Sequence, residues 1–228
     1  MKRRDFAGGV GVLGLGGWSF AAHALSLSDA DAVSGLRAAL ERGAGSAVNL
    51  LGRTDGFLGN PQVRIPLPEW LEKSAGLLRA AGQGHRVDEL ETAMNRAAEA
   101  AVPEAKALLV NAVRKMSVSD AKGILTGGDT SVTQFFADKT REPLGVRFLP
   151  IVTRATEKVS LASKYNRVAG KAALFGLVKA EHANIEQYVT GKALDGLYLM
   201  IGEEERKIRQ DPVGTGSAIL RRVFGALK

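Results

Sequence analysis

The chain has 228 residues, with 31 lysines and arginines, 24 aspartates and glutamates and no cysteine, which gives a formal net charge of +7 at neutral pH. Without cysteine the chain can form no thiolate nucleophile, disulfide, iron–sulfur cluster or c-type haem attachment. The basic residues are scattered and alternate with acidic ones, so the sequence indicates no nucleic-acid partner.

The first 24 residues have the layout of an export signal. Arg3 and Arg4 precede an apolar, glycine-rich run, and Ala22 and Ala24 are the small residues that a signal peptidase reads. Paired arginines are typical of twin-arginine signals, with the general export route as the alternative. The run is shorter than the ~20 residues of a membrane-spanning helix. We therefore predict a signal peptide cleaved after Ala24, rather than an uncleaved anchor. The mature protein, residues 25–228, is expected to be periplasmic and to lack a transmembrane segment.

A first helix is predicted over residues 28–51, where a capping-box spacing is followed by apolar residues at helical spacing. Residues 52–68 form the longest irregular stretch. The prolines on either side of Leu67 force an extended backbone there and at Ile65, so we expect both side chains to enter the core. A long loop anchored in this way is sometimes functional.

The rest of the chain shows helical periodicity interrupted by glycines and prolines. We predict helices over residues 68–82, 87–116 with a break at Pro103, 119–125, 130–137, 142–152 starting at Pro143 with a kink at Pro150, 165–177 and 184–208, and a last apolar stretch after Pro212. The sequence contains no sustained strand pattern and no repeat. These features predict an all-α protein with a single multi-helix domain.

Six segments of the chain, in this order and spacing, carry a resemblance to a known family. They are residues 65–68 (IPLP), 94–99 (MNRAAE), 119–125 (SDAKGIL), 192–198 (KALDGLY), 203–212 (EEERKIRQDP) and 223–225 (VFG). The set resembles the bacterial DUF4197 family and extends over nearly all of the mature chain. The resemblance implies an exported protein and adds no mechanism, because the family has no assigned biochemistry.

Four polar residues are the candidate ligand-binding residues. Asn95, Arg96 and Glu99 lie close together on one predicted helix, next to its alanine-rich packing face. They could point into a pocket, although a buried polar network between helices is the favoured interpretation. Asp195, with the carboxylates at 203–205, could bind a metal or do acid–base work, but nearby basic residues favour surface ion pairs.

Other chemical signals are weaker. The glycine turn at residues 126–131 precedes a helix, whose free N–H groups could bind an anion. No lysine follows in the phosphate-loop position and Asp129 would repel an anion, so a helix end followed by a helix start is the favoured interpretation. His85 and His182 are far apart in the sequence, and we predict no metal site, no cofactor and no catalytic residue set.

The resulting hypothesis is a non-catalytic binding or interaction protein of the cell envelope. Its expected partner is another envelope protein, or a small or lipid-like ligand held between helices. The alternative is an enzyme that uses carboxylates and an arginine in a pocket between helices, with Asn95, Glu99 and Asp195 as its leading residues. A structural role in the envelope is a third possibility.

Overall fold

The structure is a computed structural model that describes residues 29–176 and 183–211. The predicted signal peptide, the start of the first predicted helix and the apolar stretch after Pro212 lie outside the described residues.

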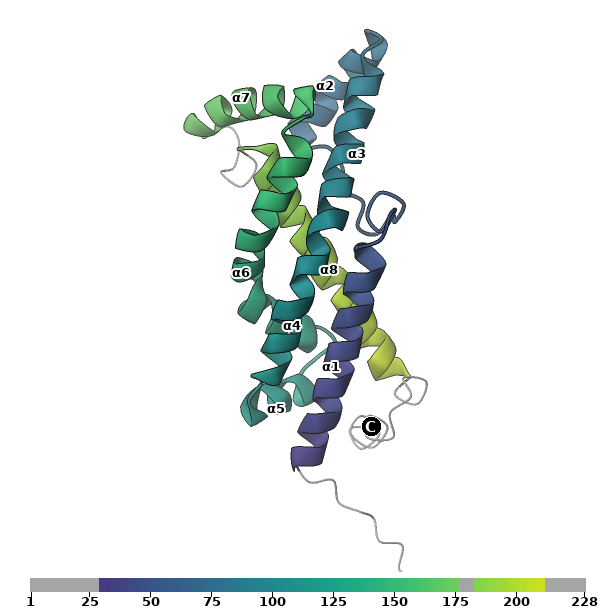
Figure 1. The fold of residues 1–228 in the computed structure, drawn as a ribbon, viewed down its shortest axis with the longest axis vertical. Helices are drawn as coiled ribbons and strands as arrows, with labels where there is room; N and C mark the ends of the chain where they lie inside the picture. Colours follow the sequence, from purple (N-terminus) through teal and green to yellow (C-terminus); the bar gives the residue numbers. More distant parts are fainter. Residues whose placement is uncertain (1–28, 177–182, 212–228) are drawn as a thin grey trace, which may run out of the picture.

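The described residues form α-helices joined by short turns and one longer loop. In chain order they are α1 (Asp29–Leu51), α2 (Glu69–Ala80), α3 (Gly84–Ala101), the 3-10 turn η1 (Val102–Glu104), α4 (Ala105–Arg114), α5 (Val118–Thr126), α6 (Ser131–Thr156), α7 (Ser160–Leu174) and α8 (Ile185–Gln210). No strand occurs in these two ranges, and the prediction of a single all-α domain is confirmed. Figure 1 shows α1, α3, α4, α6 and α8 running along the length of an elongated molecule, with α7 turned across one end.

Several helix ends have the predicted local chemistry. Gly82 adopts the left-handed conformation after α2, with φ +73°, and its N–H and that of Gln83 donate back into the last turn of the helix. At α5 a capping box that was not predicted, formed by Ser117 and Asp120, starts the helix at Val118, one residue before the predicted start. Pro103 lies in η1 and separates α3 from α4, as predicted.

The predicted helix boundary at Pro143 is wrong, because α6 is one helix through both Pro143 and Pro150. Both prolines lie on its exposed side, where water reaches the carbonyl groups that lose their partners. Buried residues recur at every fourth position across both prolines, at 132, 136, 140, 144, 148, 152 and 156. An interior proline costs about 3 kcal/mol. Fully burying one large apolar side chain contributes about 1.5–3 kcal/mol, so packing against α3 and α8 outweighs the two prolines.

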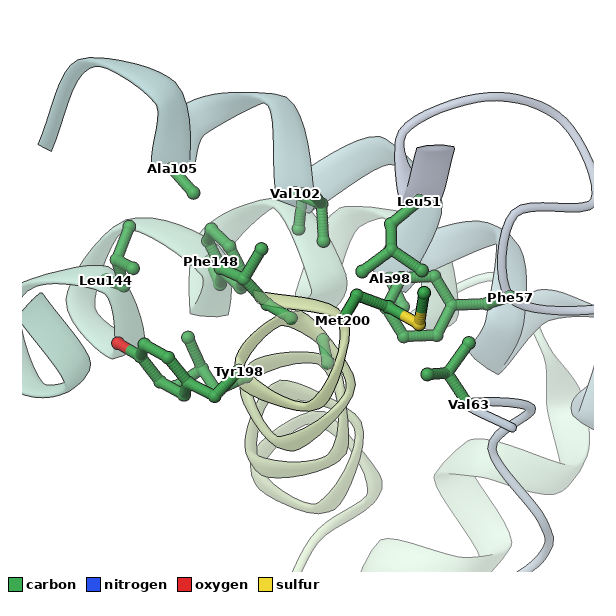
Figure 2. Close-up of a cluster of buried hydrophobic side chains, with 14 of the residues drawn as sticks. Leu51, Phe57, Val63, Ala98, Val102, Ala105, Leu144, Phe148, Tyr198 and Met200 are labelled. Carbon is green, nitrogen blue, oxygen red and sulfur yellow. The ribbon is translucent and has the colours of Figure 1, made fainter. Parts of the chain in front are cut away.

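The loop between α1 and α2, residues 52–68, packs into the middle of the core. Ile65 and Leu67 are buried, as predicted, and so are Phe57 and Val63. Figure 2 shows Phe57 and Val63 in the same apolar cluster as Leu51 at the end of α1. The loop therefore forms part of the core and is held in one position by it.

None of the helices within the described ranges has the length and apolar character needed to cross a membrane.

Candidate functional site

Asn95 of α3 is a fully buried amide that binds the backbone of the 52–68 loop. Its Oδ1 accepts a hydrogen bond from the N–H of Ile65 at 2.8 Å, and its Nδ2 donates to the carbonyl of Ile65 at 3.0 Å. Nδ2 also donates to the carbonyl of Glu91 in the preceding turn, at 2.9 Å. One side chain thus satisfies both polar backbone groups of a residue that enters the core without a helix or strand around it.

Glu99, one turn further along α3, is also buried and holds the loop at a second point. Its Oε1 accepts hydrogen bonds from the N–H groups of Phe57 and Leu58, both at 3.1 Å. Its Oε2 accepts one from Nη1 of Arg96 at 2.7 Å. The buried carboxylate is therefore compensated by two backbone dipoles and one cation.

Arg96 connects this carboxylate to the tip of the loop. Its Nη2 donates to Oδ1 of Asp55 at 2.8 Å. Hydrogen bonds to Glu99 and Asp55 raise the pKa of the guanidinium above its ordinary value. Asp55 has a left-handed backbone with φ +63°, a conformation that aspartate tolerates better than most residues. Asn95, Arg96 and Glu99 thus form one cluster, which fixes the 52–68 loop.

Asp195 lies outside the cluster of Asn95, Arg96 and Glu99. It lies on α8, where its partly exposed carboxylate pairs with Arg141 of α6 at 2.5 Å. The guanidinium of Arg141 also lies 5.7 Å from the centre of the Tyr198 ring, whose hydroxyl is 2.9 Å from Oγ1 of Thr140. The structure therefore brings three of the four candidates together, and Asp195 joins α8 to α6 instead.

Sequence reasoning missed a second buried carboxylate, Glu205 of α8. Its oxygens accept hydrogen bonds from the N–H groups of Val132 and Thr133, both at 3.2 Å, at the start of α6. Arg209 pairs with Glu205 at 2.9 Å and also donates to Oγ of Ser131 at 2.7 Å. The helix start considered above as an anion site is thus occupied by the chain's own carboxylate.

The neighbouring carboxylates behave as predicted. Glu203 pairs with Arg206 and Glu204 with Lys207, each three residues apart on the surface of α8. The signal for Glu205 was its spacing of four residues from Arg209, combined with the helix start after the glycine turn 126–131. Each of these two features is common on its own and does not single out Glu205.

An aromatic group connects α2, α7 and α8. Trp70 of α2 stacks on Tyr165 of α7 with ring centres 4.9 Å apart. Tyr188 of α8 donates to the carbonyl of Pro66 at 3.0 Å, and burial raises its pKa to about 12. Lys192 lies 5.9 Å from the Tyr188 ring. The stack of Trp70 on Tyr165 holds α7 to α2, and the Tyr188 hydrogen bond ties α8 to the 52–68 loop.

In the described part of the chain, three of the surface hollows differ in what they could hold. The first, between α1, α6 and α8, has about 20 Å³, which is room for about one water molecule. The second, about 570 Å³, is lined by residues of η1 and α4 alone, so nothing faces them across it. The third, about 320 Å³, lies between α4, α5 and α6 and has walls on more than one side. No group of histidine, aspartate and glutamate residues within the described part of the chain could hold a metal ion.

The third hollow combines an apolar floor with charged residues. Its apolar residues are Leu108, Ala112, Met116 and Phe135, and its polar ones are Asn111, Lys115, Asp120, Lys139 and Thr140. Hydrogen bonds from the N–H and hydroxyl of Ser117 lower the pKa of Asp120, as does the nearby charge of Lys139. Asp120 is thus an ionised acceptor already bonded within its own capping box.

A protein-family model matches residues 26–225, which is nearly the whole chain, and its description reads "Protein of unknown function (DUF4197)". The chain belongs to the DUF4197 family. The match includes the 52–68 loop, the α3 cluster and the Glu205 cap, so all of them lie within the DUF4197 region. Neither the curated proteins nor the solved structures gave a match.

Proposed function

We propose that this DUF4197 protein is a non-catalytic binding protein of the cell envelope that holds a small amphipathic ligand between α4, α5 and α6. The observation that carries the proposal is the 320 Å³ hollow, whose size falls in the range of small-molecule sites, roughly 300–1,000 Å³. Export to the periplasm is part of the proposal and rests on residues 1–24.

The lining supports a ligand with an apolar body and an anionic group. Met116 and Phe135 are buried beneath the hollow, whereas Lys115 and Lys139 are exposed at its rim. The two lysines outnumber the one carboxylate of the lining, that of Asp120, which is bonded to Ser117. An apolar chain can cover the floor while its charged end meets the lysines, which is how lipid-like ligands are held.

The polar clusters on α3 and α8 support a binding role in another way. Asn95, Glu99 and Glu205 direct their polar atoms at backbone N–H groups of the chain itself. Fixed loops and helix starts give a rigid scaffold, and a rigid scaffold keeps a preformed hollow open without a ligand.

The test uses anilinonaphthalene sulfonate, an apolar dye with one negative charge, on the chain starting at Leu25. Replacing Ala112 with phenylalanine should fill the hollow and weaken dye binding several-fold, as should the double variant Lys115→Gln/Lys139→Gln. Ala107→Phe, on the exposed side of the same helix, is the matched control and should bind like the parent. Equal binding by all four proteins would refute the site. Native mass spectrometry of protein recovered from its own periplasm should show a bound small molecule that Ala112→Phe loses.

A further inference from the structure

The helix α7 carries basic residues and no acidic one. From Ser160 to Leu174 it contains Lys164, Arg167 and Lys171 and neither aspartate nor glutamate. The residues just before it add Arg154 and Lys158 against one carboxylate, that of Glu157. In a chain whose charges otherwise alternate, residues 154–174 thus carry five basic residues and one acidic residue.

Large apolar side chains lie exposed among these charges. Leu174 is 86 % exposed, Phe175 80 % and Val168 54 %. In the described part of the chain, Leu174 and Phe175 are the most exposed large apolar residues. Neighbouring apolar side chains this exposed are typical of interaction sites rather than of an ordinary surface.

The charged and apolar side chains share one side of the helix. With 100° per residue, positions 164, 167, 168, 171, 174 and 175 lie within one half of the helical circumference. The adjoining side of the helix packs on the bundle, through the buried residues Leu161, Tyr165 and Ala169. Figure 1 shows the end of α7 standing clear of the other helices. We call these six positions, five in α7 and Phe175 directly after its last residue, the outer face of α7. This face is open to a partner.

We propose that the outer face of α7 docks on the surface of an anionic phospholipid membrane. Leu174 and Phe175 would enter the boundary between headgroups and acyl chains, while Lys164, Arg167 and Lys171 meet the phosphates. Basic residues beside exposed leucine and phenylalanine are the composition of helices that lie in this interface. An acidic protein surface would match the charges, but it offers no apolar layer for an adjacent leucine and phenylalanine.

The experiment measures co-sedimentation with vesicles of phosphatidylcholine containing one quarter phosphatidylglycerol. It uses the chain starting at Leu25. This chain lacks the apolar run of the predicted signal and keeps every residue that the structure describes. Binding should be strong on these vesicles and weak on pure phosphatidylcholine. It should fall when salt rises from about 0.1 M to about 1 M, where the screening length drops from about 10 Å to about 3 Å.

Two variants separate the charge from the apolar contribution. Lys164→Gln/Lys171→Gln should lower the partition coefficient about fivefold for each lysine. Leu174→Ser/Phe175→Ser should lower it by roughly tenfold or more, because the insertion of apolar area is lost. All these positions are exposed, so the melting temperature should not change.

The matched controls carry the same changes on other faces. Lys73→Gln/Lys106→Gln removes two exposed lysines, and Leu77→Ser replaces a leucine of α2 that is 75 % exposed. Both controls should bind vesicles like the parent. Failure to bind the anionic vesicles, or equal binding by the α7 variants and their controls, would overturn the proposal. So would self-association of the chain that Leu174→Ser/Phe175→Ser abolishes without any effect on vesicle binding.

Discussion

The ring of Phe57 lies against Gly196 of α8 so closely that a Cβ atom on residue 196 would come within 2.8 Å of its Cε1. The same added atom would lie 3.3 Å from Cβ of Val63. Glu99 holds the backbone N–H of Phe57 from the other direction. The 52–68 loop thus packs between α3 and α8. At position 196 any side chain larger than that of glycine would collide with the ring of Phe57.

We expect Gly196→Ala to lower the free energy of unfolding by about 1–3 kcal/mol, because a packed core accommodates extra atoms poorly. Gly191→Ala, on the same helix with no atom within 4 Å of its added Cβ, is the control. It should raise stability by roughly 0.5–1 kcal/mol, the usual gain over glycine in a helix. Urea unfolding of both variants measures the contrast. An equal effect of both would mean that the Phe57 contact does not restrict residue 196.

Glu99→Ala should cost roughly 1–3 kcal/mol, because it leaves the buried N–H of Phe57 and its neighbour Leu58 without an acceptor. Asp195→Ala should cost less than about 1 kcal/mol, since its pair with Arg141 is partly exposed. Thermal melts beside Glu104→Ala, an exposed control, give the comparison. A neutral or stabilising Glu99→Ala would instead indicate that the fold holds this carboxylate for a ligand.

Glu205→Ala should be the most destabilising carboxylate substitution on α8, at roughly 1–3 kcal/mol, since it leaves the buried N–H of Val132 and that of Thr133 without their acceptor. Glu203→Ala, two positions away in the sequence, removes only a surface pair and should change stability by less than about 1 kcal/mol. Denaturant midpoints of the two variants are the measurement. Similar midpoints would show that the α6 cap contributes little.

Alkaline pH should unfold the protein through its tyrosines. Burial raises the pKa of Tyr165, Tyr188 and Tyr198, that of Tyr188 to about 12. The folded state therefore favours the neutral phenol, so this contribution to stability is complete below pH about 10 and is lost as pH rises toward about 12. Ultraviolet titration should show phenolate forming later in the folded chain than in guanidinium. Coincident curves would contradict this.

Export can be tested on the N-terminus. Sequencing of periplasmic material should find Leu25 as the first residue. Replacing Arg3 and Arg4 with lysines should leave precursor in the cytoplasm if the twin-arginine route is used. Normal export of that double variant would exclude this route and leave the predicted location intact.

The helices could be predicted to a large extent because their signals are local. The helix-ending glycine at 82, the break at Pro103 and the start of α8 after Asn184 all follow from backbone sterics and capping. The continuity of α6 through Pro143 could not be predicted, since it depends on packing against residues of α3 and α8 that are far away in the sequence. A proline gives the same local signal whether or not its helix is held by packing.

In the candidate site, too, local features could be predicted from the sequence and contacts between distant residues could not. Asn95, Arg96 and Glu99 could be singled out as polar residues beside a packing face, but their partners are backbone groups, which a sequence does not display. The notable case is Glu205, which reads as one member of a run of three glutamates and proves to be the buried one. Only the crossing of α6 over α8 distinguishes it from Glu203 and Glu204.

The stack of Trp70 on Tyr165 gives the protein an optical reporter at one end. Trp18 is the only other tryptophan and lies in the predicted signal, so the tryptophan fluorescence of the chain starting at Leu25 comes from Trp70 alone. Its emission senses whether α7 rests on α2, whereas circular dichroism averages over every helix. Comparing the two during vesicle binding or heating would reveal whether α7 detaches before the bundle melts, without any label being attached.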